Sequence, residues 1–258
     1  MSRRSDRIIA LLAGGLLSVI FVSCSAVQVA GWTTGVVEQK AHRTIPGPVD
    51  ELQIHAGGGD VMLMPARGSN VEIDSRTRGS LHTPQLDVEA LGSDVNVSGG
   101  CDEVSFGHCE ATLLVRVPRG TAVIVETSSG DLSANGLDGN VTLHTASGDV
   151  FAHNLSGRLD LDSASGDVDG SALRSATVRA HTGSGDVDLH FANPPDTAEA
   201  DTGSGDVRIA VPRGPETYNV DVDAGSGTDD NDLVPDPASR RLLRADTGSG
   251  DIEITYSS

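Results

Sequence analysis

The chain has 258 residues and a formal net charge of −19, and 37% of its residues are hydrophobic but only 3% aromatic. So few aromatic residues argue against a core of large rings and favour a narrow interior of stacked aliphatic side chains. After residue 43 the chain has 13 arginines and 35 acidic side chains. Because nucleic-acid binding rests on basic side chains that neutralise phosphates, this charge excludes nucleic acid as a partner. Cationic partners and divalent ions stay open.

The first 32 residues have the pattern of a signal-anchor. Arg3, Arg4 and Arg7 precede an uncharged run from Ile8 to Trp32, which exceeds the about 20 residues that span a bilayer. The basic flank predicts a cytoplasmic N-terminus and a single pass through the bacterial cytoplasmic membrane, with the rest of the chain outside. Two alternatives stay open. The segment is a cleaved secretion signal, or Cys24, which follows a lipobox-like Phe-Val-Ser, is lipidated.

The polar stretch 33–48 ends in Pro-Gly-Pro and predicts a linker. An extracytoplasmic β-strand-repeat domain is expected over 49–258, with an irregular part over 49–120 and regular repeats over 121–258. In the irregular part, Cys101 and Cys109 lie eight positions apart. In an oxidising compartment they are candidates for a local disulfide. Free thiols, or a metal site with neighbouring His or acidic residues, are the alternatives.

A Ser-Gly-Asp motif followed by an aliphatic residue recurs through the second half of the chain, with a degenerate copy at Gly225–Thr228 and a near-copy at Gly92–Val95. The first steps between motifs are 18, 18, 19 and 20 residues. A period near 20 residues means that each copy is one structural unit stacked on the next. Gly permits backbone angles that other residues avoid, and Asp and Ser bond nearby amides in tight turns. These corner residues, expected to be structural, are Gly130, Asp131, Gly148, Asp149, Gly166, Asp167, Gly185, Asp186, Gly205, Asp206, Gly250 and Asp251.

Alternating apolar and polar residues flank each motif, for example at 140–144 and 158–162 before it and at 187–191 and 207–211 after it. Such alternation is typical of half-buried strands. The sequence therefore predicts an all-β, single-domain β-solenoid of 18–23-residue repeats, preceded by one membrane helix; a β-sandwich is the alternative. The closing segment Ile252–Tyr256 is expected to leave an edge strand that must be capped or paired to avoid end-to-end association. The residues expected to stack inward are Val150, Val168, Val187, Val207 and Ile252.

The basic N-terminus, the membrane segment, the Cys-loop-Cys and the tandem Ser-Gly-Asp-Val strands together resemble a bacterial family. This is the putative-adhesin β-strand-repeat family, a domain of unknown function related to LiaG-like envelope proteins. The resemblance covers about residues 49–258. It implies a right-handed solenoid with one strand per face, located outside the membrane, and no established activity.

The sequence offers no isolated catalytic constellation, because its carboxylates are abundant and its histidines are scattered. We therefore expect no catalytic site, no metal site and no cofactor. The predicted function is a membrane-tethered envelope scaffold or adhesin that binds a cell-envelope component, a surface protein or a glycan. A calcium-responsive module, in which the corner aspartates bind calcium, is the alternative. A polysaccharide-acting enzyme is less favoured.

Overall fold

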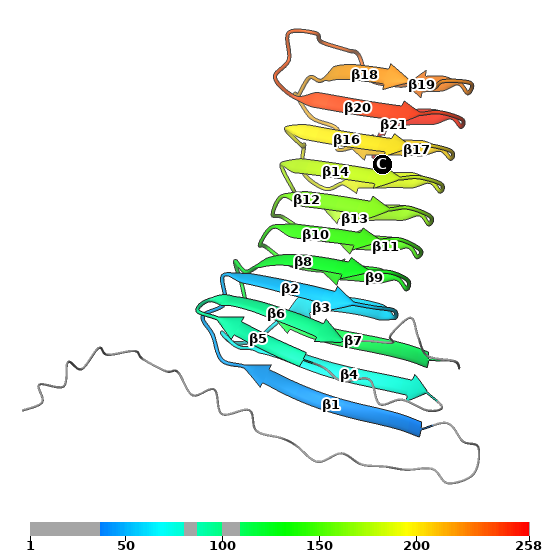
Figure 1. Ribbon diagram of the computed structural model, residues 1–258. Coiled ribbons are helices and arrows are strands. Elements are labelled where there is room, and N and C mark those ends of the chain that lie inside the picture. The colour runs from blue at the N-terminus through cyan, green and yellow to red at the C-terminus, as the bar shows by residue number, and fades with distance from the viewer. Residues whose placement is uncertain (1–36, 80–86, 100–108, 258) are drawn as a thin grey trace, which may run out of the picture.

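In the computed structural model, which describes residues 37–79, 87–99 and 109–257, the chain forms two β-sheets stacked face to face (Figure 1). Sheet A has eleven strands and sheet B has ten. No helix occurs among the described residues, and so none of them forms a helix that could cross a membrane. The all-β prediction is confirmed. The predicted anchor Ile8–Trp32 and Cys24 lie outside the described residues.

The regular part is a stack of coils, and each coil contributes one strand to each sheet. Every strand pairs in parallel with the strand of the coil before it and the strand of the coil after it. This solenoid-like pairing differs from the antiparallel hairpins of a sandwich. The strands of sheet B are β8 (Ala122–Thr127), β10 (Val141–Thr145), β12 (Leu159–Ser163), β14 (Thr177–Thr182) and β16 (Thr197–Thr202). The strands of sheet A are β9 (Leu132–Asn135), β11 (Val150–His153), β13 (Val168–Leu173), β15 (Val187–Phe191) and β17 (Val207–Val211).

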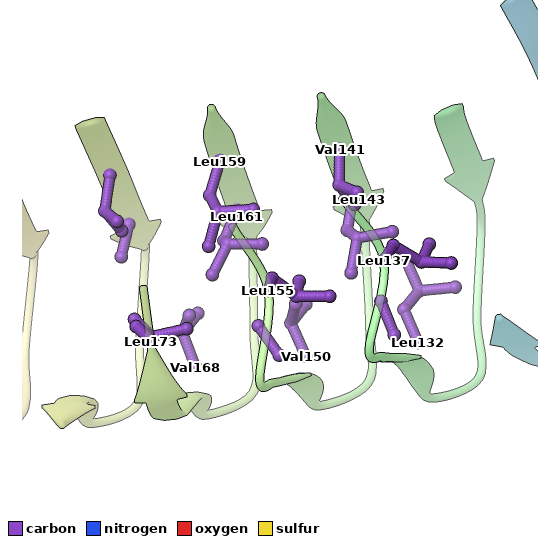
Figure 2. Packing of buried hydrophobic residues seen from close by; sticks show 14 of the residues in the cluster. Leu132, Leu137, Val141, Leu143, Val150, Leu155, Leu159, Leu161, Val168 and Leu173 are labelled. Carbon is purple, nitrogen blue, oxygen red and sulfur yellow. The ribbon is translucent and has the colours of Figure 1, made fainter. Parts of the chain in front are cut away.

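Aliphatic side chains at alternate strand positions fill the space between the sheets. The five residues predicted to stack inward are at most 1% exposed. Leu137 and Leu155 come from the loops that lead back to sheet B, and with Leu173 they add a further row of buried side chains (Figure 2). The core is therefore continuous along the stack and needs almost no aromatic residues.

The last coils do not follow the order of the sequence. Strands β18 (Asn219–Asp223) and β19 (Asp229–Asn231) form the outermost coil, while β20 (Leu242–Thr247) and β21 (Ile252–Tyr256) insert between it and β16–β17. The prediction that Ile252–Tyr256 is an edge strand is therefore wrong. The apolar alternation of β21 suits a position with a neighbour on both sides, whereas β18 and β19 expose polar residues at the end of the stack.

A similar exchange occurs at the other end. Strands β2 (Glu51–Ala56) and β3 (Asp60–Pro65) lie between β8–β9 and the coil of β6 (Asp94–Gly99) and β7 (Cys109–Val117). Sheet A then continues with the antiparallel strands β4 (Val71–Gly79) and β1 (Val37–Ile45). Sheet B ends with β5 (Asp87–Leu91), antiparallel to β6.

Two sequence predictions need correction at this end. Much of the predicted linker 33–48 is strand β1, because all nine of its residues pair with β4 although few of them are apolar. The near-copy at Gly92–Val95 is no repeat corner. It forms the turn of the β5–β6 hairpin, and Asp94 begins a strand of sheet B, whereas the motif aspartates precede strands of sheet A. Cys101 lies outside the described residues and so does the side chain of Cys109, so their disulfide stays a prediction.

Candidate binding face

The corner aspartates lie in one column along an edge of the stack. The Oδ1 atom of each accepts a hydrogen bond from the backbone N–H of the corner aspartate in the next coil, at 2.8–3.1 Å. The column runs from Asp60 to Asp251 and ends at Thr228, whose backbone N–H and hydroxyl both donate to Asp251. These two bonds lower the pKa of Asp251. The degenerate corner therefore lies in the last coil of the stack. Thr228 donates to the column, and among the described residues no following coil has a backbone N–H that would need a carboxylate at this position.

The corner glycines are in close contact with each other. Gly185 has φ +143°, and a Cβ there would lie 2.3 Å from the carbonyl oxygen of Gly166 in the neighbouring coil. Thr182, whose side chain is buried, donates its hydroxyl to the same oxygen at 2.8 Å. Equivalent bonds recur along the column. Over residues 37–79, 87–99 and 109–257, no three His, Cys, Asp or Glu side chains are placed to hold a metal ion. The corner atoms thus hold one coil to the next.

The outer face of sheet B carries a column of alternating histidines and carboxylates. Three contacts join neighbouring strands: His55 Nδ1 to Glu126 Oε2 at 3.1 Å, His144 Nδ1 to Asp162 Oδ1 at 3.0 Å, and His181 Nδ1 to Asp201 Oδ1 at 3.7 Å. The strand register makes these six residues one row across β2, β8, β10, β12, β14 and β16. Asp246 of β20 extends the row.

A second row on the same face alternates in charge. The register aligns Asp160, Arg179, Glu199, Arg244 and Asp221 across β12, β14, β16, β20 and β18. Arg179 Nε lies 2.7 Å from Glu199 Oε2, and this contact raises the pKa of Arg179. Opposite charges on neighbouring strands attract, so the row also helps to set the order of the coils.

Between the two rows lies an open groove of about 400 Å³. Guanidinium donors and carboxylate acceptors alternate along it at the spacing of the strands. We call its polar lining the ladder face: Asp160, Arg179, His181, Glu199, Asp201, Arg244 and Asp246. Two of these residues come from β20, so the inserted coil completes the groove. Such a surface suits a polar ligand that both donates and accepts hydrogen bonds, such as a glycan or a charged peptide.

Sequence reasoning missed the ladder face, because it treated the histidines as scattered. The signal was present in the repeat itself. His55, Glu126, His144, Asp162, His181, Asp201 and Asp246 all stand five residues before a corner aspartate. The second row stands seven residues before the corner residue, which is Thr228 in the last coil. Counting back by a fixed number of residues from each motif therefore finds both rows. It also shows which acidic and basic residues face each other on neighbouring strands.

The outer face of sheet A is less regular. Burial and the neighbouring Asp188 carboxylate raise the pKa of Asp169, which lies opposite Asp188 on β13 and β15. His190 Nε2 lies 2.9 Å from Asp188 Oδ1. Phe151 on β11 is 42% exposed in the same row. This face combines charged and apolar side chains without the alternation of sheet B.

Comparisons with known proteins identify the family of the chain. A family model described as Toastrack DUF4097 matches residues 43–258, in agreement with the resemblance seen in the sequence. No curated protein matches the chain. Among solved structures, a putative adhesin from Bacteroides fragilis is 13% identical over 83% of this chain and 96% of its own, with a TM-score of 0.44. A putative cell adhesion protein from Clostridium sporogenes is 12% identical over 85% of this chain and 100% of its own, with a TM-score of 0.36.

Proposed function

The chain belongs to the Toastrack DUF4097 family, and from this premise we propose that it is a non-catalytic, adhesin-like protein of the bacterial envelope. It is tethered by Ile8–Trp32, carries its repeats outside the cytoplasmic membrane, and binds a polar envelope component through the ladder face. The repeats act as a rigid support that fixes the spacing of the binding groups.

The ladder face is the observation that carries this proposal. Its side chains are held at the strand spacing by backbone pairing, so a ligand with repeated polar groups meets donors and acceptors already in position. Its guanidinium and carboxylate groups contact each other and solvent, and no nucleophile with an adjacent base lies among them. The arrangement supports recognition of a ligand rather than its chemical conversion.

Binding can be tested with the purified full chain and isolated cell walls. We expect the chain to sediment with walls, and Arg179→Ala/Arg244→Ala to reduce the bound fraction about tenfold, since each arginine offers charge-assisted bonds. The matched control is Arg158→Ala/Arg208→Ala, which removes the same charge from exposed positions outside the ladder face. Equal loss in both variants would point to general electrostatics and contradict a specific face. Release of soluble sugar from the walls would instead favour the alternative that the chain is a polysaccharide-acting enzyme.

The tether is tested separately. Protease added to cells stripped of their walls should digest the repeats, and full protection would refute the orientation. The intact mass of the mature protein distinguishes an uncleaved anchor from lipidation at Cys24 or cleavage of a signal. This measurement does not depend on whether the ladder face binds a ligand.

A further inference from the structure

A cluster of cations lies where the chain enters the fold. At the start of β1, Glu38 contacts Lys40 Nζ at 3.3 Å, Arg76 Nε at 3.5 Å and Arg78 Nε at 3.8 Å. The three basic side chains are 63%, 57% and 52% exposed, so their charge reaches solvent. The Lys40 ammonium, with smaller contributions from Arg78 and Arg76, lowers the pKa of Glu38. Cations therefore outnumber the carboxylate that they contact by three to one.

An apolar surface adjoins these cations. Lys40 and Arg76 border an open groove of about 570 Å³ on the outer face of sheet A. Its lining includes Met62, which is 45% exposed, and Leu114, which lies opposite Met62 on β7. We define the basic patch as Lys40, Arg76, Arg78, Met62 and Leu114. Basic groups beside exposed apolar side chains are typical of surfaces that contact lipid headgroups.

The regular repeats and the last coils have the opposite charge. Residues 121–258 carry 24 acidic side chains and 8 arginines, whereas in β1 and β4 together basic residues outnumber acidic ones by four to three. In Figure 1, β1 and β4 lie at one end of the stack and β18 and β19 at the other. An anionic surface would therefore attract β1 and β4 and repel the second end.

The length of chain before β1 limits where this end can be. Four residues separate Trp32 from Val37, the first residue of β1. The five steps from Trp32 to Val37 span at most about 18 Å when fully extended. If Ile8–Trp32 is inserted in a bilayer, the basic patch lies within reach of the headgroups of that bilayer.

We propose that the basic patch docks on the anionic headgroups of the membrane that holds the tether, while the acidic far end of the stack stays off that membrane. This inference rests on the proposed tether but not on the ligand of the ladder face. Docking holds the β1–β4 end of the stack at the membrane and leaves the ladder face, on the other sheet, open to a partner.

The single tryptophan of the chain allows a direct test by fluorescence quenching with brominated lipids. The full chain is reconstituted in vesicles of phosphatidylcholine alone, or of phosphatidylcholine and phosphatidylglycerol in equal parts. Trp32 in the wild-type chain reports on the tether. Trp32→Phe/Met62→Trp reports on the patch, and Trp32→Phe/Val234→Trp reports on the far end, where Val234 is 83% exposed. Thr112→Trp, which also lines the groove, replaces Met62→Trp if that variant fails to fold.

We expect brominated lipid to quench Met62→Trp strongly in phosphatidylglycerol vesicles, and weakly in neutral vesicles or in high salt. Val234→Trp should stay unquenched in both. Lys40→Glu/Arg76→Glu should lower the ratio of docked to undocked protein by more than tenfold. Each basic group near an anionic surface raises this equilibrium ratio about fivefold. The matched control Arg158→Glu/Arg208→Glu should leave this ratio unchanged.

Each other outcome has a distinct meaning. If Trp32 itself is not quenched, the tether fails and with it the proposed topology. If Trp32 is quenched but Met62→Trp is not, docking alone is refuted. Equal quenching of Met62→Trp in neutral vesicles, or after charge reversal, would overturn recognition of anionic headgroups. A shift in Met62→Trp emission that depends on protein concentration in detergent, without vesicles, would show that a second copy covers the patch and would also overturn the proposal.

Discussion

The regular coils and the inserted coils, β2–β3 and β20–β21, use the same corner chemistry in different chain orders. From β8 to β17 each coil pairs with its neighbours in sequence, whereas at each end a coil inserts between two others. Despite this, the aspartate column continues unbroken from Asp60 through Asp131 and from Asp206 to Asp251. The corner bonds therefore depend on spatial neighbours only. The degenerate copy at Gly225–Thr228 lies in the outermost coil.

The largest difference in stability between the regular stack and the outermost coil is expected when a charge is placed at a core position. Val187 is fully buried in the regular stack, while Val220 of the outermost coil is partly exposed. Val187→Asp should lower the free energy of unfolding by about 4 kcal/mol or more, because the carboxylate has no partner. Val220→Asp should lower the free energy of unfolding much less, because the new carboxylate can reach water when the last coil frays. Thermal melting of both variants makes this comparison, and equal melting temperatures would contradict it.

The corner glycines give the next largest effect. Gly185→Ala adds a Cβ 2.3 Å from a backbone oxygen at a φ that side chains avoid, so a loss of about 3 kcal/mol or more is expected. Gly120 is the control, because it has φ +75° and nothing lies within 4 Å of its Cβ position. Gly120→Ala should cost about 1 kcal/mol. Denaturant titration measures both, and similar losses would show that stacking does not require glycine at the corner.

The aspartate column should show a smaller effect. Asp186 Oδ1 accepts the N–H of Asp206 at 2.8 Å, and Asp186→Ala leaves this part-buried donor without its partner, at a cost of about 1–3 kcal/mol. Asp186→Asn keeps an acceptor and should recover most of the loss. At the end of the column Thr228→Ala removes only an exposed hydroxyl, and a cost below about 1 kcal/mol is expected. A larger loss for Thr228→Ala than for Asp186→Ala would contradict this assignment.

The smallest effects depend on pH and differ in sign between the regions. The pKa of Asp169, in the regular stack, is raised by burial and by Asp188. Its ionisation therefore opposes folding, and Asp169→Asn should raise the melting temperature near neutral pH. This gain should disappear as the pH falls below the reference pKa of about 3.9, where the carboxyl is protonated in both states.

Asp74, at the N-terminal end, should behave in the opposite way. Burial raises its pKa, but hydrogen bonds from Arg116 at 2.7 Å and His42 at 2.6 Å outweigh burial and lower the pKa overall. Asp74→Asn should therefore lower the melting temperature near neutral pH. The difference from wild type should vanish as the pH falls through the lowered pKa. Melting curves between neutral pH and about pH 3 test both variants, and the same sign for Asp74→Asn and Asp169→Asn would contradict the contrast.

Sequence reasoning recovered the regular coils closely and the ends poorly. The segments 187–191 and 207–211 are strands β15 and β17 with the predicted bounds, because strict alternation and a fixed corner specify the strand and its inward face. The insertion of β20–β21 between two other coils could not be read from the sequence of a single repeat. Every regular repeat has the same alternation and corner, so these features do not show which coil pairs with which. Strand β1 was missed for the same reason, as its pairing with β4 rather than its composition makes it a strand.

The candidate site was predictable in part. The corner residues were found from the motif, and the ladder face could have been found by comparing residues at fixed offsets from it. What no offset shows is the order of the coils, and that order places Arg244 of β20 beside Glu199 and completes the groove. The basic patch combines residues of β1, β3, β4 and β7, which become neighbours only through the antiparallel extension of sheet A.

The insertion of the last coil is therefore the point on which both the fold and the ladder face depend, and cross-linking tests it directly. Glu199 lies opposite Arg244, and Asp221 lies one strand further away, so the pairs are separated by about 4.8 Å and about 9.6 Å across the sheet. A thiol cross-linker that spans only neighbouring strands should join Glu199→Cys to Arg244→Cys and leave Glu199→Cys/Asp221→Cys unjoined, as read by peptide mass mapping. A cross-link between positions 199 and 221, without one between 199 and 244, would show that the coils follow sequence order and would contradict the account.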